Sequence, residues 1–416
     1  MKLFSTTIFS GITAFVKIAS GFIATKVISG FAGPAGVALV GSLTNFMAVM
    51  LSLANGSVNS GIVKYTAEFK NDFRKSKILY DTSIFISVVC SAIVSLVLLL
   101  FSKYWSEKIF HNVKYQSVIV LFGLGIIFYS LNTILLAILN GLGYIKKYTI
   151  INGLSSIFTL VLTIVLIYYY NVTGALYALV LSQFLVFFVA CLLVVKHLKN
   201  KINFDFLRPD FTTIKNLSHF SVMAIVSSSA MPLAQILIRN FITKEIDLDH
   251  AGIWQGLIRI SDGYHLMINI TLGTYFLPKL SALKDNSEIK KEVVNGIKFL
   301  APLFLLMCLG IYLGRFYIIK ILYSEKFFAM QELFFWQLAG DFFKVLSLIF
   351  SYLMLSKVMT KTFITTEVLF AFVYVVLSLF FVPSIGLQGA SIAFFVTFLA
   401  CFILMILIFR KTLFVK

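Results

Sequence analysis

The residues of this chain that could do chemistry are charged side chains set inside long apolar runs. They comprise six cations and three acids: Lys17, Lys26, Arg239, Arg259, Lys298, Lys344, Asp262, Asp341 and Glu367. A cation at the centre of a membrane helix costs about 2.5 to 3.5 kcal/mol on insertion scales. This cost predicts that the charged side chains face a water-filled cavity or one another, and that they serve a function.

Two acid–base pairs are spaced so that both side chains lie on one face of a helix. We expect ion pairs between Arg259 and Asp262 and between Asp341 and Lys344. The same ion pairs could instead hold two helices together without binding any ligand, so a purely structural role stays open. His265 shares the face of Asp262 and could carry a proton, although a lone histidine is also typical of packing. The candidates for ion coupling or for ion pairs in a cavity are Asp262, His265, Asp341 and Glu367.

The cations that have no acid nearby in the sequence favour an anionic cargo. Lys17 and Lys26 have no acid nearby in the sequence, and cations outnumber acids within the apolar runs. A phosphate-bearing substrate would satisfy such cations through charge-assisted hydrogen bonds. Aromatic side chains could stack on sugar rings, although packing and interface roles are open for them too. The candidate substrate-binding residues are Lys17, Lys26, Arg239, Trp254, Arg259, Tyr264 and Lys344.

The elements that position these residues must be transmembrane helices. The 416 residues are 60% hydrophobic and 12% charged, whereas soluble proteins are about 25% charged. Apolar runs of the length that a bilayer demands recur from end to end. They lie near residues 8–29, 34–61, 78–101, 117–139, 148–170, 173–195, 217–241, 250–276, 295–315, 333–356, 361–382 and 386–409. We therefore predict an all-α polytopic membrane protein of about twelve transmembrane helices.

The charge of the loops predicts the orientation of these helices. With the N-terminus inside, the inner loops and tails hold 22 Lys and Arg residues and the outer loops hold 7. The positive-inside rule then places both termini in the cytoplasm. The formal charge of +18 is spread mainly over loops on one membrane face, where it meets anionic lipid. We therefore expect membrane lipids as partners and no nucleic acid.

An internal repeat divides the chain into two halves. Six helices in each half would give both halves the same orientation, related by an axis along the membrane normal. We predict six-helix bundles over residues 1–200 and 217–416, joined by a cytoplasmic linker over 201–216, and alternating access between them. At offsets of 215 or 216 residues, the coincidences are Ala35-Gly36 on Ala251-Gly252, Lys64–Ala67 on Lys279–Ala282, Lys146 on Lys361 and Gly174-Ala175 on Gly389-Ala390.

The chain carries no sequence signature of catalysis. It has no Walker-type glycine loop, nucleotide fingerprint, zinc spacing or nucleophile elbow. The four cysteines, Cys90, Cys191, Cys308 and Cys401, are scattered without paired spacing, which supports neither a metal site nor a disulfide framework. We expect a transporter and no enzyme, with no cofactor, driven by a proton or sodium gradient or by consumption of its product.

Several local motifs carry a family resemblance. They are FAGPAGV at 31–37, GIWQG at 252–256, Ser261-Asp262, FLP at 276–278 and KFFAMQELFFWQLAGD at 326–341, followed by Lys344. This set is similar to the Wzx-type polysaccharide-unit flippases of the multidrug/oligosaccharidyl-lipid/polysaccharide superfamily. The likeness is strongest to the branch that serves enterobacterial common antigen, whose lipid-linked unit is lipid III.

The resemblance implies a fold and a substrate. The fold would be two six-helix bundles that form a V around a central cationic cavity. The substrate would be an undecaprenyl-pyrophosphate-linked oligosaccharide, moved from the cytoplasmic to the periplasmic leaflet of a Gram-negative inner membrane. The glycan stays open between the common antigen unit and an O-antigen unit of lipopolysaccharide biosynthesis. The resemblance also implies association with a polysaccharide polymerase and a chain-length regulator.

Three other functions compete with this one. An ion-coupled multidrug or small-molecule exporter of the same fold would need a cavity dominated by acids. A membrane glycosyltransferase or polymerase would need a large outer loop, and none here exceeds about twenty residues. A scaffold for assembly enzymes remains open.

Overall fold

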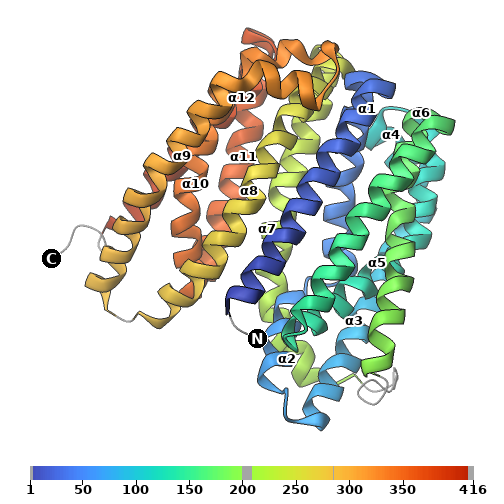
Figure 1. Cartoon of the computed structure of the whole chain (residues 1–416), viewed down its shortest axis with the longest axis vertical. Helices are drawn as coiled ribbons and strands as arrows, with labels where there is room; N and C mark the ends of the chain where they lie inside the picture. Colours follow the sequence, from blue (N-terminus) through green and yellow to red (C-terminus); the bar gives the residue numbers. More distant parts are fainter. Residues whose placement is uncertain (1–2, 199–208, 284, 411–416) are drawn as a thin grey trace. The chain divides into compact units, whose positions relative to one another are not determined.

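The computed structural model of the chain is helical throughout the part that it describes. It covers residues 3–198, 209–283 and 285–410, with the backbone alone for residues 3–10, 193–198, 219–220 and 274. Within these ranges there are twelve α-helices, two 3-10 helices and no strand (Figure 1). The all-α prediction is therefore confirmed.

The chain divides into two compact units. Unit 1 comprises Met1–Ala32 and Leu39–Leu233, and unit 2 comprises Gly33–Ala38 and Ala234–Lys416. The helices that supply unit 1 are α1 (Leu3–Ala54), α2 (Asn59–Glu68), α3 (Phe73–Leu100), α4 (Ser102–Phe110), η1 (Val113–Tyr115), α5 (Gln116–Gly141), α6 (Ile145–Leu198) and the first part of α7 (Phe211–Glu245). Unit 2 contains the rest of α7 with α8 (Leu248–Ala282), α9 (Asn286–Leu322), η2 (Glu325–Leu333), α10 (Phe334–Ser356), α11 (Thr360–Ile385) and α12 (Gln388–Ile408).

The boundary between the units lies inside α7, whereas the sequence placed the second half from residue 217 onward. The beginning of α7 packs into unit 1, where Leu217 belongs to the hydrophobic core. The Ser228 hydroxyl lies 2.7 Å from that of Ser52, and the Asp210 amide donates to the Thr82 hydroxyl at 3.2 Å. Of the linker predicted over 201–216, residues 201–208 lie outside the described residues.

Helix lengths agree with about twelve membrane crossings. Among the described residues, nine helices are long and apolar enough to span a bilayer. In two of them, α1 and α6, the qualifying stretches of 44 and 48 residues are about twice the length of one crossing. Each of these helices is interrupted once by non-helical backbone, at Gly33 and at Asn171. The 35 residues of α8 are also long enough to span, although polar side chains along its middle keep it outside the nine.

The internal repeat is visible in the backbone. A shift of 215 residues moves 145–170, the first segment of α6, onto 360–385, which are the bounds of α11. Two pairs of residues with positive φ have the same offset, since Gly143 (78°) corresponds to Val358 (55°) and Asn171 (49°) to Gly386 (74°). A residue with positive φ therefore precedes and follows this helical segment in both halves, which a duplication explains.

Close helix packing repeats at this offset as well. A Cβ atom at Gly174 would lie 1.9 Å from the carbonyl oxygen of Leu166, and one at Gly389 would lie 2.3 Å from that of Phe381. No side chain fits at either position, so each tight hairpin requires glycine. The small residues that marked the repeat in the sequence are thus needed for packing.

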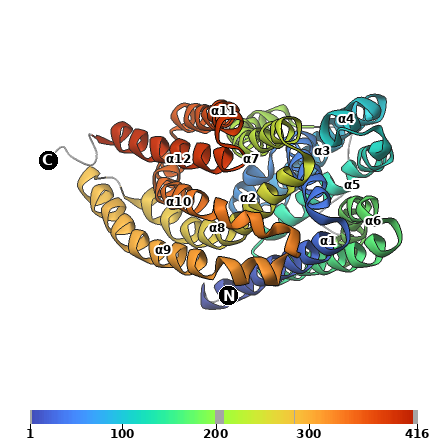
Figure 2. The same ribbon diagram turned by 90° about the horizontal axis from the view of Figure 1, so that it is seen from above.

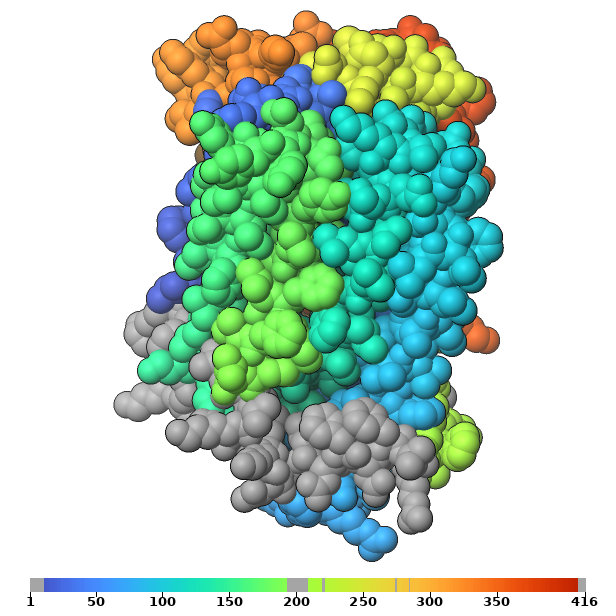
Figure 3. Space-filling model, turned by 90° about the vertical axis from the view of Figure 1, so that its right-hand side faces the viewer, coloured from blue at the N-terminus to red at the C-terminus, as the bar shows by residue number. Residues whose placement is uncertain are grey.

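The surfaces of the helices match a lipid environment. The face of unit 1 formed by α3, α5 and α6 is visible in Figure 3. Exposed side chains on these helices include Leu100, Leu124, Val161 and Tyr169. Large apolar side chains in such numbers would be unstable in water but are the expected surface of a membrane protein.

In unit 2, α10 occupies the centre. It contacts α8, α9, α11, α12 and η2, and α9 lies along its side at the edge of the unit (Figure 2). A polar side chain on α10 therefore meets groups from several helices away from lipid.

Carboxylates cap helices near the ends of unit 1. Asp72 accepts a hydrogen bond from the backbone N–H of Lys75 at 3.0 Å, at the start of α3, and this bond lowers the pKa of Asp72. Hydrogen bonds from Thr212 and Thr213, at the start of α7, lower the pKa of Asp210. Both caps satisfy amides that a helix leaves unpaired.

Candidate functional site

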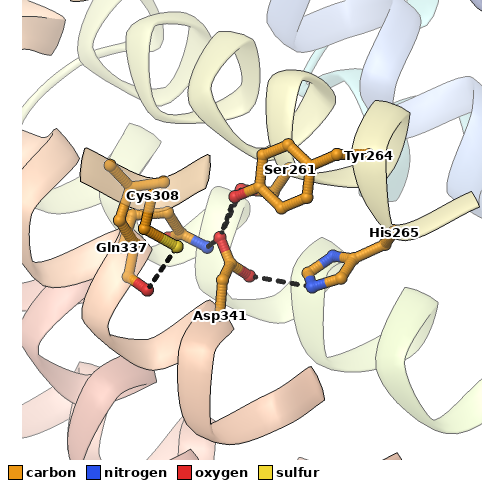
Figure 4. A network of polar contacts seen from close by, with 7 residues as sticks. Ser261, Tyr264, His265, Cys308, Gln337 and Asp341 are labelled. Carbon is orange, nitrogen blue, oxygen red and sulfur yellow. Dashed lines mark hydrogen bonds and ion pairs between the residues drawn. The ribbon is translucent and has the colours of Figure 1, made fainter. Parts of the chain in front are cut away.

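Asp341 is the centre of a buried polar network in unit 2 (Figure 4). Its side chain is 0% exposed. The Oδ2 atom accepts hydrogen bonds from the Ser261 hydroxyl at 2.8 Å and from the Tyr264 hydroxyl, and a longer one from Gln337 Nε2 at 3.4 Å. The Oδ1 atom lies 3.3 Å from Nε2 of His265, which is itself buried.

Helical spacing builds this network. Ser261, Tyr264 and His265 stand at i, i+3 and i+4 on α8, so they project from one face. Gln337 and Asp341 are four residues apart on α10 and likewise share a face. Because α8 and α10 are in contact, the two faces meet and the five side chains converge.

The pair of His265 and Asp341 has unused hydrogen-bonding capacity. The Oδ1 atom of Asp341 and both ring nitrogens of His265 are buried without a hydrogen-bond partner, as is the Oε1 atom of Gln337. A proton on the imidazole would make it a donor to the carboxylate, and a proton on the carboxyl group would make that group a donor to the imidazole. The geometry therefore suits the uptake of one proton that either side chain can hold.

The expected ion pair between Asp341 and Lys344 is wrong. Asp341 is paired with His265, and the Lys344 ammonium lies 5.3 Å from the ring centroid of Phe398 and 5.5 Å from that of Phe394. The faces of these α12 rings attract the cation and hold it away from the carboxylate. Lys344 is nevertheless close enough to act electrostatically on Asp262, His265, Asp341 and Glu367.

The expected ion pair between Arg259 and Asp262 is not formed either. The ion pairs recorded for the described residues do not include it. The Asp262 side chain is exposed while Arg259 is partly buried, so a shared helix face does not by itself bring the two groups into an ion pair. Arg239, Arg259 and Lys344 all act electrostatically on Asp262. Unit 2 thus surrounds one exposed carboxylate with three cations.

Arg239 and Trp254 are buried inside unit 2. Arg239 is 1% exposed and Trp254 0%. The guanidinium donates to Oε1 of Gln255, and its central carbon lies 5.8 Å from the Trp254 ring centroid. In this conformation the two side chains join α7 to α8, and neither is open to a substrate.

The remaining predicted residues are not brought into the network. Lys17 and Lys26 belong to unit 1, where both are exposed on α1. They are separated by nine residues, or about two and a half helical turns, so they lie on opposite sides of that helix. Glu367 is partly buried on α11.

Sequence reasoning missed Ser261, Gln337 and Cys308 as members of the site. All three are uncharged, so the cost of burying a charge in the membrane gives no reason to select them. The available signal was spacing, because Gln337 precedes Asp341 by four residues and Ser261 precedes His265 by four. Within the described residues, no group of three or more His, Cys, Asp or Glu side chains could hold a metal ion.

The FAGPAGV segment at 31–37 meets the start of α8, the helix that carries GIWQG, in unit 2. The backbone N–H of Ala35 donates to Oδ1 of Asp249 at 2.9 Å, so Asp249 caps the second segment of α1 from another helix. This segment starts at Pro34, directly after the positive φ of Gly33. Proline is favoured at a first helical position because it has no N–H to satisfy there.

Replacing Asp249 with Ala is expected to destabilise the protein by about 1 kcal/mol, because the cap of the second α1 segment is lost. Asp249→Asn should retain most of the stability, since an asparagine oxygen also accepts the Ala35 N–H. Thermal unfolding of both variants in one detergent checks this. Equal melting temperatures for the alanine and wild-type proteins would contradict a stabilising role for the cap.

Comparison with known proteins identifies sequence relatives. A family model described as "Polysaccharide biosynthesis protein" matches residues 39–332, and one described as "Lipid II flippase MurJ" matches residues 257–416. The lipid III flippase of Escherichia coli (strain K12) is 30% identical over 409 residues, which cover 97% of each chain. The lipid III flippase of Shigella flexneri matches equally well.

Solved structures share the fold at low sequence identity. An inward-facing multidrug resistance MATE family transporter of the MOP superfamily has a TM-score of 0.79 at 16% identity, covering 96% of this chain and 98% of its own. The lipid II flippase MurJ in an inward closed conformation has a TM-score of 0.76 at 16% identity, covering 98% of this chain and 87% of its own. Both likenesses agree with the MOP-type fold expected from the sequence.

Proposed function

This chain belongs to the lipid III flippase family of polysaccharide biosynthesis proteins, and on that premise we propose that it flips an undecaprenyl-pyrophosphate-linked oligosaccharide across the bacterial inner membrane. The observation that carries the proposal is the 30% identity to the E. coli lipid III flippase over 97% of both chains. The cargo would be the lipid III of enterobacterial common antigen or an O-antigen unit. The chain would act as a multi-pass transporter, with no chemical reaction of its own.

The charges of unit 2 support an anionic cargo. Arg259 and Lys344 are partly accessible, and both act on the exposed Asp262. A diphosphate carries the charge that such cations attract, while its polyprenyl tail can stay in lipid. Alternating access would then present the cations to each leaflet in turn.

We propose a proton as the coupling ion, with the pair of Asp341 and His265 as its carrier. Both side chains are buried, and the unused acceptor atoms of the pair support proton uptake. Sodium ions are the alternative. Titratable and charged groups that interact electrostatically with the pair are Tyr264 from α8, Cys308 from α9, Lys344 from α10 and Tyr374 from α11.

Orientation and assembly are further parts of this proposal. We place both termini in the cytoplasm, because the basic loops would then face inward. We also propose that the protein associates with the polymerase and the chain-length regulator that use its product.

The test of function is a strain that lacks this protein. We expect the strain to accumulate the undecaprenyl-pyrophosphate oligosaccharide in the cytoplasmic leaflet, and the wild-type chain to relieve the block. Separate strains that accumulate lipid III and an O-antigen unit would identify the glycan by which of them is rescued. If no lipid-linked glycan accumulates, drug efflux by the same strain tests the exporter alternative.

Reversal of charge at Arg259 is expected to abolish rescue, because a glutamate there repels a diphosphate and adds a second acid beside Asp262. We expect Arg259→Glu to lower flipping at least about tenfold, as for the loss of a charge-assisted hydrogen bond. Lys103→Glu, at an exposed position on α4, is the matched control and should rescue normally. Full rescue by Arg259→Glu at equal expression would remove Arg259 from the substrate path.

A further inference from the structure

An apolar groove runs between α9 and α10 at the edge of unit 2. Its volume is about 310 Å³, and its walls include Cys308, Leu309 and Tyr312 from α9 with Phe335, Ala339 and Phe342 from α10. The lining spans Leu305 to Tyr312 on α9, or roughly 11 Å at 1.5 Å per residue. At about 30 Å³ per water-sized group, the volume holds on the order of ten carbon atoms.

Two small residues explain why a gap remains between α9 and α10. On α9 the lining residues follow helical periodicity, and so do those on α10, so two complete stripes face each other. Cys308 and Ala339 stand in the middle of these stripes, where larger side chains would interlock. The Cys308 thiol instead donates to the carbonyl oxygen of Leu338 at 3.8 Å and lies beside the Asp341 network (Figure 4).

The groove is open to hydrocarbon. Leu305 and Leu309 are each 49% exposed and Phe335 54%. In a membrane such an apolar opening is filled by hydrocarbon, since the bilayer core contains no water. The rings of Tyr312, Phe335, Phe342 and Phe343 supply much of the wall, and flat surfaces of this kind suit a rigid, unsaturated chain better than a flexible saturated one.

A cation lies at one end of the groove. The guanidinium of Arg315 lies 4.2 Å from the ring centroid of Tyr312, and its Nη1 atom donates to the Tyr312 carbonyl oxygen at 2.7 Å. Its Nε atom is buried without a hydrogen-bond partner, and the recorded ion pairs give Arg315 no acid. The charge at the end of an apolar groove thus complements a lipid with an anionic phosphate head.

We propose that this groove binds part of the polyprenyl chain of the substrate, with its diphosphate at Arg315. The inference rests on the proposed function for the identity of the lipid. Methyl-branched, unsaturated isoprene units present flat faces to the four rings, and the diphosphate matches the guanidinium. In the orientation expected from the loops, Arg315 lies near the outer end of α9, so the groove would hold the lipid after it has been flipped.

The experiment measures binding of geranylgeranyl diphosphate to the purified full-length chain in detergent. Ala339→Phe fills the groove and is expected to weaken binding about tenfold. Leu313→Phe is the control, because Leu313 is 77% exposed on α9, the helix of the opposite wall, and is outside the groove. Cys308→Leu fills the groove from the other wall and should act like Ala339→Phe, so a folding defect in one variant does not decide the result.

A second comparison separates the contribution of the diphosphate head group from that of the polyprenyl chain. Arg315→Gln should weaken binding of geranylgeranyl diphosphate about tenfold but leave binding of geranylgeraniol, which lacks phosphate, unchanged. Phosphatidylglycerol should compete poorly. Equal competition by phosphatidylglycerol, or equal binding by Ala339→Phe and Leu313→Phe, would overturn the inference. The binding experiment tests the groove, and rescue of the deletion strain tests the proposed function. If the binding result is negative but the wild-type chain rescues the strain, only the groove is ruled out. If the wild-type chain fails to rescue, the proposed function is ruled out.

Discussion

Replacing Asp341 with Asn is expected to abolish proton-driven flipping while the protein stays folded. Asparagine has the shape of aspartate, and its oxygen can still accept hydrogen bonds from Ser261 and Tyr264. It cannot ionise, so the proposed proton uptake by the pair with His265 would be lost. In proteoliposomes with an imposed pH gradient, we expect wild-type flipping to respond to the gradient and Asp341→Asn to lose at least about tenfold, as for removal of a positioned acid–base group.

Two further variants separate coupling from structure. Asp341→Ala removes the acceptor of the buried Ser261 hydroxyl, while the partly buried Tyr264 hydroxyl can still donate to Ser261. It should cost about 1–3 kcal/mol for each group left unsatisfied, which lowers the melting temperature as well. Asp72→Asn removes an exposed carboxylate at the start of α3 and should leave the gradient response intact. If Asp341→Asn still responds to the pH gradient like the wild type, Asp341 is not the proton carrier. If the wild-type protein responds to a sodium gradient and not to a pH gradient, sodium is the coupling ion.

The largest effect on folding is expected from Gly252→Ala. A Cβ atom at Gly252 would lie 1.9 Å from the carbonyl oxygen of Pro34 and 2.3 Å from its carbonyl carbon. Both atoms are backbone, so they cannot move aside as a flexible side chain could. Overpacking of this kind costs typically about 1–3 kcal/mol or more. We expect a large loss of folded protein, measured as the monodisperse fraction after purification and as the melting temperature.

Gly310→Ala is the matched control for this substitution. Gly310 lies in α9 of the same unit, and a Cβ atom there meets nothing within 4 Å. Alanine should be neutral or stabilising by about 0.5–1 kcal/mol, because glycine loses more backbone entropy in a helix. Equal yields of Gly252→Ala and Gly310→Ala would show that the two motifs do not depend on this close approach.

Several features of the fold could be predicted from the sequence because they depend on composition and period. A chain rich in apolar runs of bilayer length must form helices, since lipid offers no partner for free backbone groups. The positions of most runs agree with the helices in the structure. Repeated glycines at 174 and 389 also had structural meaning, as both permit a tight hairpin.

Partner choice among the buried charges could not be predicted in this way. Spacing along one helix suggested Lys344 as the partner of Asp341, but the partner is His265 from α8. Lys344 is held by aromatic rings of α12, and no pattern in the sequence shows that these rings lie there. Arg239, chosen as an accessible cation, is buried against Trp254 for a similar reason.

The sequence by itself determined that this protein is a helical membrane protein with a duplicated plan, cations within its spans and a flippase resemblance. These properties follow from local composition, from the length of a bilayer and from residues compared at a fixed offset. Only the tertiary structure decided which side chains meet, where α9 and α10 leave space, and which charges are covered. Those outcomes depend on contacts between helices far apart in the chain, where the position of a few small or aromatic side chains settles what each charge can reach.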